Sequence, residues 1–312
     1  MTRTRFLAAG LLLAAAVPLA ACGGGSDPLA PATGAGGGST GGSTGGSAAG
    51  SVKIGSADFP ESALLGEIYA QALEAKGSTV ARQFNIGSRE TYLKAISGGE
   101  VDVLPEYTGS LLTYYDKAST VTQPDEVYAA LQKAVPQGLT VLDKSVAEDK
   151  DSIAVTKETA SQWSLKAIPD LAAHQSELTL GAPPEFKTRQ RGLVGLKSVY
   201  NVVPSQFRPL QSQATVEALK NGQIKAANIF TTDPSIAANG FVVLDDPQSL
   251  FGSDNVVPLV RSDKADALKA TLNAVSAKLD TTSLADMVKQ VVVDKKDASE
   301  VAKTWLASSG LA

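Results

Sequence analysis

The sequence predicts an α/β protein of two lobes, each a mixed sheet flanked by helices. Three observations predict it: a folded region of roughly 261 residues, an internal repeat within that region, and two segments suited to carrying the chain between lobes. A single hydrophobic core stops growing near ~250 to 300 residues, so a region of this size favours two compact lobes. At 43% hydrophobic and 19% charged residues, the composition is that of an ordinary globular protein.

The first 22 residues have the layout of an export signal. Arg3 and Arg5 precede an apolar run over 6–19, which is shorter than a membrane span requires. The run ends in Leu-Ala-Ala-Cys, which resembles the lipobox of bacterial lipoproteins and predicts a lipoprotein signal peptide over 1–22. Cys22 would then become the lipidated first residue, holding the protein on the outer face of the cytoplasmic membrane, periplasmic or at the cell surface. A signal cut elsewhere, with an incidental cysteine, is the alternative.

Residues 23–50 predict a disordered tether. They are rich in Gly and Ser, with repeats such as Gly-Gly-Ser-Thr, and hold almost no large apolar side chains. Such a chain lacks the apolar surface that would offset its ordering entropy, and its root-mean-square reach is about 30 Å. The tether would let a folded domain move over the membrane surface.

The folded region repeats itself. Residues 95–103 and 218–226, which lie 123 positions apart, each read as a helix end, a Gly stop and a short strand. At the same offset Tyr107-Thr108 aligns with Phe230-Thr231, so each copy delivers an aromatic ring and a hydroxyl just past its strand. Upstream, an apolar strand at 52–56 corresponds to another at 178–182. Strands alternating with helices in each half predict two α/β lobes of similar topology.

Helices and lobe boundaries follow from the remaining pattern. Helical periodicity covers 63–76 and 192–200, and three further helices close the chain at 265–279, 283–292 and 298–307. Two segments, 141–155 and 245–259, connect an apolar strand to a polar stretch and would cross between lobes. The prediction is therefore that 52–145 plus 256–312 form lobe 1 and 146–255 form lobe 2, with a hinge crossed twice.

Charge and residue scarcity exclude most chemistry. The formal charge is −4, which argues against nucleic-acid binding, and one Cys and one His exclude a disulfide, a thiolate metal cluster and a Cys/His dyad. We expect no cofactor and no metal. A secreted hydrolase or transferase is disfavoured because His174 has no GxSxG motif beside it. A lipoprotein scaffold without a small ligand remains as a further alternative.

Six motifs, in order, resemble those of osmoprotectant-binding lipoproteins, the glycine betaine, choline and carnitine receptors of ABC importers. They are GSADFPES at 55–62, NIGS at 85–88, PEYTG at 105–109, PEFKTR at 184–189, GLVGL at 192–196 and FTTD at 230–233. The resemblance covers essentially the whole region from residue 52 on. It implies a two-lobed periplasmic binding protein of type II, with a twice-crossed hinge, that closes on a solute without chemistry. It also implies a monomer that works with ABC permease and ATPase subunits.

The resemblance also implies a ligand site. A permanent cation cannot donate a hydrogen bond, and a cage of aromatic faces attracts it through cation–π interactions. Tyr107 and Phe230 match two cage positions, Arg189 matches a ligand contact, and Ser110 lies where a small polar residue helps bind the other end of the ligand. The candidate ligand-binding residues are Asp58, Phe59, Ser88, Arg89, Tyr107, Thr108, Ser110, Asp151, Glu185, Arg189, Phe230, Thr231, Asp254 and Asn255.

Three departures from the family pattern leave the ligand open. Phe230 stands where the family commonly has Tyr, Ala57 occupies a position that is often polar, and no aromatic residue lies near Asp151 or Asp254, where further cage tyrosines are expected. One reading is a weaker cage in which Asp151 or Asp254 neutralises the cation directly. The other is a pocket for a different, larger or uncharged solute.

Overall fold

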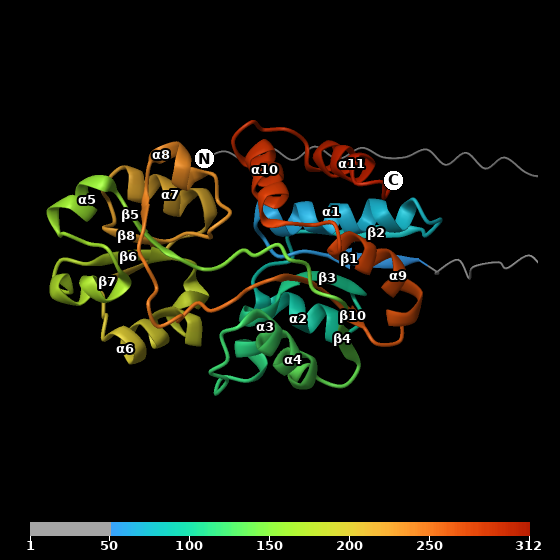
Figure 1. Ribbon diagram of the computed structural model, residues 1–312, viewed down its shortest axis with the longest axis horizontal. Helices are drawn as coiled ribbons and strands as arrows, with labels where there is room; N and C mark the ends of the chain where they lie inside the picture. Colours follow the sequence, from blue (N-terminus) through green and yellow to red (C-terminus); the bar gives the residue numbers. More distant parts are fainter. Residues whose placement is uncertain (1–50) are drawn as a thin grey trace, which may run out of the picture. The chain divides into compact units, whose positions relative to one another are not determined.

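The computed structural model describes residues 51–312, which fold around two five-stranded mixed sheets (Figure 1). The first sheet has the order β2 (Val80–Gln83), β1 (Val52–Gly55), β3 (Val103–Tyr107), β10 (Val256–Arg261) and β4 (Leu139–Val141). Strands β2, β1 and β3 are parallel, and β10 runs antiparallel to both β3 and β4. The predicted α/β fold with two mixed sheets flanked by helices is confirmed.

Helices cover both faces of the first sheet, and its central strands β3 and β10 are buried on both sides. Val256 and Val260 pack into one core, and Val257 and Leu259 into the other, as the alternation of side chains along β10 requires. The helices on the first face are α1 (Pro60–Glu74), α9 (Ala265–Ser276), α10 (Thr281–Val292) and α11 (Ala298–Ser308). Those on the second face are α2 (Arg89–Ser97), α3 (Thr108–Tyr115) and α4 (Pro124–Ala134).

The second sheet repeats the topology of the first. Its order is β7 (Gln206–Pro209), β6 (Thr179–Ala182), β8 (Ala226–Asn228), β5 (Ile153–Val155) and β9 (Val242–Val243), and β7, β6 and β8 are parallel. Strands β6, β7 and β8 thus take the places of β1, β2 and β3, which confirms the two similar halves that the sequence repeat predicts.

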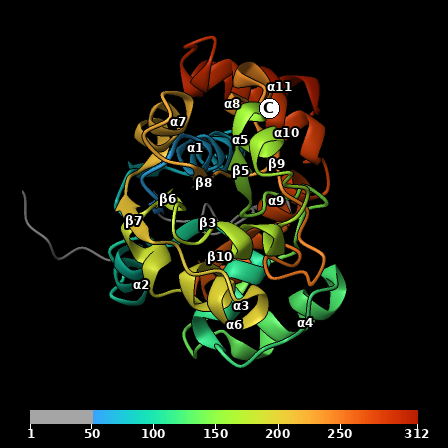
Figure 2. The same ribbon diagram turned by 90° about the vertical axis from the view of Figure 1, so that its left-hand side faces the viewer.

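Helical segments flank the second sheet as well. Helices α7 (Ser212–Lys220) and α8 (Ser235–Asn239) pack on one face. On the other face the core includes α5 (Lys157–Gln162), α6 (Gly195–Tyr200) and the short turns η1 (Ile168–His174) and η2 (Pro184–Lys187). Figure 2 shows α7 and α6 on opposite sides of β6.

The chain passes between the two sheets twice, from β4 to β5 over 142–152 and from β9 to β10 over 244–255. The two crossing segments touch: Glu148 and Asn255 form an antiparallel bridge, and the Asp149 amide donates to the Asp254 carbonyl at 3.1 Å. We call residues 142–152 and 244–255 the first and second crossing segments.

Two helices differ from the sequence prediction. Helix α1 begins at Pro60, not at residue 63, because proline has no amide hydrogen to leave unpaired and its φ suits the first helical position. The helix expected over 192–200 is interrupted: Gln190–Val194 forms a wide turn (η3), and regular helix begins at Gly195. Arg191 and Gly192 have non-helical backbone angles there, and the Arg191 side chain pairs with Asp254 of the second crossing segment.

The predicted signal peptide over 1–22, Cys22 and the tether over 23–50 lie outside the described residues. Within 51–312, no helix combines the length and apolar character needed to cross a bilayer.

Candidate functional site

A cavity of about 320 Å³ lies between the two sheets and takes its lining from both. From the first lobe come the residues before and at the start of α1, the start of α2, the end of β3 and the start of α3. From the second lobe come η2, the segment after it and the residues that follow β8. Both crossing segments also contribute, so the cavity lies at the carboxyl ends of parallel strands, where open α/β sheets bind ligands.

Three aromatic rings from both lobes stack along this cavity. Phe59 lies between the other two, with its ring centroid 6.2 Å from that of Tyr107 and 5.5 Å from that of Phe230. The interplanar angles are 30° and 26°, so each of the two outer rings is stacked on Phe59. Tyr107 ends β3, and Phe230 follows β8 at the equivalent place in the repeat. The sequence repeat therefore predicted two rings that the structure brings to one place.

Two buried carboxyl groups lie beside the rings. Glu61 accepts hydrogen bonds from the Tyr107 hydroxyl at 2.7 Å and the Thr232 hydroxyl at 2.6 Å. Asp149, on the first crossing segment, accepts one from the Thr232 amide at 3.0 Å. Burial raises the pKa of Glu61, an effect that the hydrogen bonds from Thr232 and Tyr107 partly offset. Burial and then the negative charge of Glu61 raise the pKa of Asp149 well above its ordinary value.

Arg89 is the most buried cation of the cavity lining. It begins α2, and its Nε and Nη2 atoms each donate to Glu106 at 2.9 Å, in the parallel geometry that arginine and carboxylate favour. The Tyr92 hydroxyl also donates to Glu106. Burial lowers the pKa of Arg89, but the charge of Glu106, the hydrogen bonds to it and other neighbouring groups together raise that pKa well above its ordinary value. The guanidinium is therefore a fixed positive charge.

Arg189 joins the lobes. Its Nε and Nη2 atoms donate to Glu90 of α2 at 3.1 and 3.0 Å, and it also lies 3.7 Å from Glu185. Against the effect of partial burial, hydrogen bonds from Arg189 lower the pKa of Glu90 to about 2. Because Glu90 stays ionised above that pH, the ion pair persists through the physiological range.

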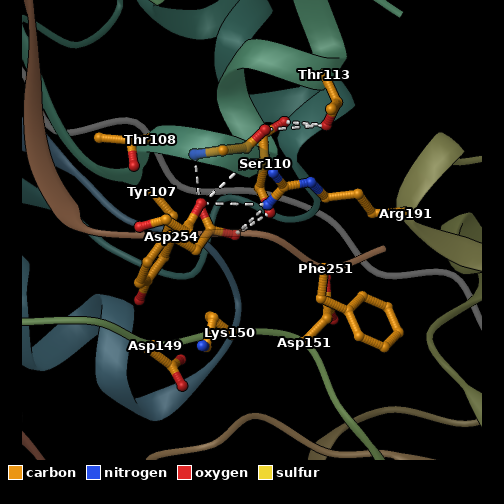
Figure 3. A network of polar contacts seen from close by, with 12 residues as sticks. Tyr107, Thr108, Ser110, Thr113, Asp149, Lys150, Asp151, Arg191, Phe251 and Asp254 are labelled. Atoms are coloured by element: carbon orange, nitrogen blue, oxygen red, sulfur yellow. Dashed lines mark hydrogen bonds and ion pairs between the residues drawn. The ribbon is translucent and has the colours of Figure 1, made fainter. Parts of the chain in front are cut away.

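Asp254, on the second crossing segment, is occupied by protein groups (Figure 3). Its carboxylate accepts from the amides of Gly109 and Ser110 at the start of α3, from the Ser110 hydroxyl at 2.5 Å, and from Arg191 at 3.3 Å. A carboxylate at a helix amino terminus is stabilised by the helix dipole. Gly109 permits the close approach, since a Cβ atom there would meet the Ser253 carbonyl oxygen at 2.2 Å. Asp254 therefore holds the hinge and has little capacity left for a ligand cation.

Asp151 is only half-buried and accepts one hydrogen bond, from the Asn228 side chain at 2.8 Å. Burial raises its pKa, and the charges of Arg189 and Arg191 counteract this in part. Beyond it a second cavity, of about 200 Å³, shares Arg89, Ser110, Asp151 and Arg189 with the first. The arginine side of the site therefore continues into further space.

Most of the candidate ligand-binding residues line the main cavity, and three do not. The lining includes Asp58, Phe59, Ser88, Arg89, Tyr107, Ser110, Asp151, Glu185, Arg189, Phe230 and Asp254. Thr108 and Asn255 lie behind the surface and bond each other, with the Asn255 amide donating to the Thr108 hydroxyl at 3.0 Å. Thr231 turns toward the first crossing segment, where its hydroxyl accepts from the Lys150 amide at 3.0 Å. These three hydroxyl and amide groups position the hinge instead of facing the cavity.

Sequence reasoning missed Glu61, Asp149 and Thr232. Glu61 could have been predicted, because Pro60 marks the first helical position and the residue after it lies at the positive end of α1, where a carboxylate is favoured. Asp149 lies within the polar stretch of the first crossing, which gave no sign of which of its charges turns inward. Thr232 follows the aligned Thr231, and strand ends give no local signal for which of two neighbouring threonines faces the other lobe.

Comparison with known proteins identifies the family. The family model described as "Substrate binding domain of ABC-type glycine betaine transport system" matches residues 50–308. The glycine betaine-binding protein YehZ of Escherichia coli is 28% identical over 276 residues, covering 83% of this chain and 90% of that protein. The ergothioneine transport permease/ergothioneine binding protein EgtU of Helicobacter pylori is 26% identical, covering 80% of this chain and 46% of that protein.

Solved structures share the fold. The crystal structure of a glycine betaine/carnitine/choline ABC transporter protein superimposes with a TM-score of 0.66 at 24% identity, covering 83% of this chain and 99% of the other. This likeness establishes the two-lobed architecture.

Proposed function

Because the chain belongs to the family of substrate-binding domains of ABC-type glycine betaine transport systems, we propose that it binds a quaternary-ammonium osmoprotectant such as glycine betaine or choline and hands it to an ABC permease. The family consists of binding proteins, so the protein is not an enzyme. It acts as the extracytoplasmic substrate-binding component of an importer.

The observation that carries the choice of ligand is the stack of Phe59, Tyr107 and Phe230 beside Glu61 and Asp149. A trimethylammonium group carries a permanent charge and an apolar surface, and it offers no hydrogen-bond donor. Aromatic faces contact the methyl groups of this cation and attract its charge through cation–π interactions, which contribute on the order of 0.5 to 2 kcal/mol per ring. The carboxyl groups balance the charge.

The arginine side suits a carboxylate or hydroxyl at the other end of the solute. Arg89 and Arg189 each use Nε and Nη2 for a protein carboxylate, and within residues 51–312 the Nη1 atom of each makes no hydrogen bond. The Nη1 groups of both arginines therefore remain as donors for a ligand carboxylate, while both side chains stay fixed. Ser110, which lines both cavities, adds a hydroxyl.

A larger solute in the same receptor is the alternative. It is favoured by the second cavity of about 200 Å³ that adjoins the arginine side, which gives room beyond that needed by glycine betaine. The relative named for ergothioneine, at 26% identity, supports including that larger betaine among the solutes tested.

Closure of two lobes would trap the solute. In this proposal lobe 1 comprises 52–145 plus 256–312 and lobe 2 comprises 146–255, and the crossing segments form the hinge. Ligand shifts the population toward the closed state by its greater affinity for that state. The protein would be a lipoprotein anchored through Cys22, with 23–50 as its tether. If the Cys22→Ser variant is released into the medium while the wild type stays bound to the membrane, the result would support anchoring through Cys22.

Isothermal titration of the purified mature chain tests the ligand. The panel is glycine betaine, choline, carnitine, proline betaine and ergothioneine. We expect saturable one-to-one binding of at least one of them. Failure of every member to bind would refute the quaternary-ammonium assignment and leave the receptor fold in place.

A matched pair of variants tests the site. Phe230→Leu removes a ring from the stack, and Phe207→Leu removes a similarly half-buried phenylalanine of β7 outside the cavity. Loss of one cation–π contact predicts affinity about 3- to 30-fold weaker for Phe230→Leu. Phe207→Leu should bind like the wild type. Equal affinity of the two variants would mean that the aromatic stack is not the ligand site.

A further inference from the structure

Glu61 and Asp149 form a carboxyl pair that is 4% and 2% exposed, in the wall of the main cavity. Glu61 belongs to the first turn of α1, and Asp149 belongs to the first crossing segment, which Figure 3 shows passing through the site. Thr232, from the second lobe, touches both: its hydroxyl donates to Glu61 at 2.6 Å and its amide donates to Asp149 at 3.0 Å. The pair thus lies where lobe 1, lobe 2 and the hinge meet.

The charged groups around the pair do not balance it. Tyr107 from β3 donates a neutral hydrogen bond, and Asp233, after β8, adds negative charge that raises the pKa of Glu61 further. Among residues 51–312, neither Glu61 nor Asp149 forms an ion pair. The other ionisable groups that line the cavity are Asp58 before α1, Tyr92 and Arg89 from α2, Asp151 from the first crossing segment, Glu185 and Arg189 from the segment around η2, Asp254 from the second crossing segment, and Lys295 after α10.

The positively charged groups of the cavity lining either pair with other carboxylates or are exposed to solvent. Arg89 and Arg189 are held by Glu106 and Glu90, and Lys295 is exposed. Two carboxylates so close together in a buried site cannot both ionise at ordinary cost, so such a pair keeps one proton to higher pH than an isolated carboxyl.

We propose that Glu61 and Asp149 share one proton in the ligand-free receptor and that the cationic head of the solute replaces this proton, so that binding releases one proton to solution. The exchange balances: a pair with one negative charge and one proton takes up a monocation and becomes a pair of two carboxylates. No bond other than the O–H bond of the carboxyl breaks. The inference rests on the proposed function, because it requires a cationic ligand at the aromatic stack.

The exchange follows from the position of the pair. The rings of Phe59, Tyr107 and Phe230 hold the methyl surface of a trimethylammonium group beside Glu61, to which Tyr107 donates its hydroxyl. A positive charge there stabilises both carboxylates and lowers the affinity of the pair for its proton. By linkage, affinity for the cation rises with pH between the proton affinities of the free and the occupied pair, by up to about tenfold per pH unit.

Calorimetry measures the released proton directly. Choline is titrated into the mature chain at pH 7 in phosphate and in Tris, whose ionisation heats differ, and the difference between the observed heats gives the protons released per ligand. We expect a value near one for the wild type and near zero for Asp149→Asn. Asp263→Asn, at an exposed carboxylate paired with Arg261, should keep the wild-type value. The uncharged isostere 3,3-dimethylbutan-1-ol should release none.

An infrared measurement tests the shared proton without any ligand. A protonated carboxylic acid has a carbonyl band distinct from that of carboxylates. The ligand-free wild type at pH 7 should show this band, choline should remove it, and both Asp149→Asn and Glu61→Gln should lack it. The two variants guard against the failure of either one to fold.

The outcomes separate this inference from the proposed function. Saturable choline binding with no proton released, or with equal release from Asp149→Asn, overturns the exchange and leaves the receptor assignment intact. Absence of the protonated-carboxyl band in the ligand-free wild type also overturns it. If no quaternary-ammonium probe binds, the proposed function fails and the exchange fails with it.

Discussion

The hydrogen bond from the Thr232 hydroxyl to Glu61 should contribute strongly to holding the two lobes together. The hydroxyl donates to Glu61 at 2.6 Å in a buried site, and Thr232 and Glu61 belong to opposite lobes. Replacing Thr232 by valine keeps the shape of the side chain and the amide hydrogen bond to Asp149, and removes only the hydroxyl. The perturbation therefore acts on closure and leaves the fold of either lobe in place.

The size of the effect follows from the kind of hydrogen bond. Net contributions of hydrogen bonds to charged groups are about 1.5 to 3 kcal/mol. Glu61 keeps its other partner, the Tyr107 hydroxyl, so its carboxyl is not left without a donor. If the whole loss falls on the closed state, affinity for the ligand weakens by about 10- to 100-fold.

Titration calorimetry measures that loss, and fluorescence energy transfer between one dye on each lobe measures closure. Thr159→Val is the control, because Thr159 is also a buried threonine of the second lobe but belongs to α5, away from the cavity. The reasoning is refuted if Thr232→Val binds as tightly as the wild type, or if Thr159→Val loses as much affinity.

Three further predictions concern ion pairs and titration. Glu90→Gln removes the ion pair to Arg189, which is about a third exposed, so affinity should fall by no more than about tenfold at any pH from 5 to 8, measured calorimetrically. The raised pKa of Asp149 means that the folded state holds the proton more tightly than the unfolded state, so ligand-free stability should fall as pH rises through that pKa; Asp149→Asn should flatten this decline in thermal melts. Asp254→Ala leaves buried Arg191 unpaired and should lower the free energy of unfolding by about 3 kcal/mol or more in urea titrations.

Each of these three predictions would be contradicted by a specific result. Affinity that falls at pH 8 but not at pH 5 in Glu90→Gln would contradict a pKa of about 2 for Glu90. A melting temperature that depends on pH equally in Asp149→Asn and in the wild type would assign the titration to another group. Wild-type stability of Asp254→Ala would mean that Arg191 finds a new partner.

The fold was predictable because the sequence contains an internal repeat, with one copy for each sheet. The strand and glycine pattern at 52–56 recurs at 178–182, and both copies form the second strand of their sheet in the observed order, β1 and β6. A short apolar run that ends in glycine is typical of a buried strand, and most residues of β1 and β6 are buried, so this pattern located both strands. It failed at Arg191 and Gly192, where the backbone is non-helical and Arg191 pairs with Asp254 of the second crossing segment.

For the site, the sequence predicted which segments come together but not which side chains bond each other. Phe59, Tyr107 and Phe230 lie in the cavity because strand ends and helix starts converge there. The partners of charged residues were not predictable: Arg189 is bonded to Glu90, which lies 99 residues away along the chain. Such pairings depend on lobe-to-lobe geometry, and no local spacing records them.

The hinge and the ligand site share residues, and this has a kinetic consequence. Asp149 and Asp254 belong to crossing segments that are bonded to each other, so the two strands of the hinge bend together. In the proposed site, a solute beside Asp149 would stiffen the first crossing segment, which must flex for the solute to leave. Its residence time is then set by the rate of lobe opening, and a permease that speeds delivery would do so by bending this paired ribbon, not by competing for the solute.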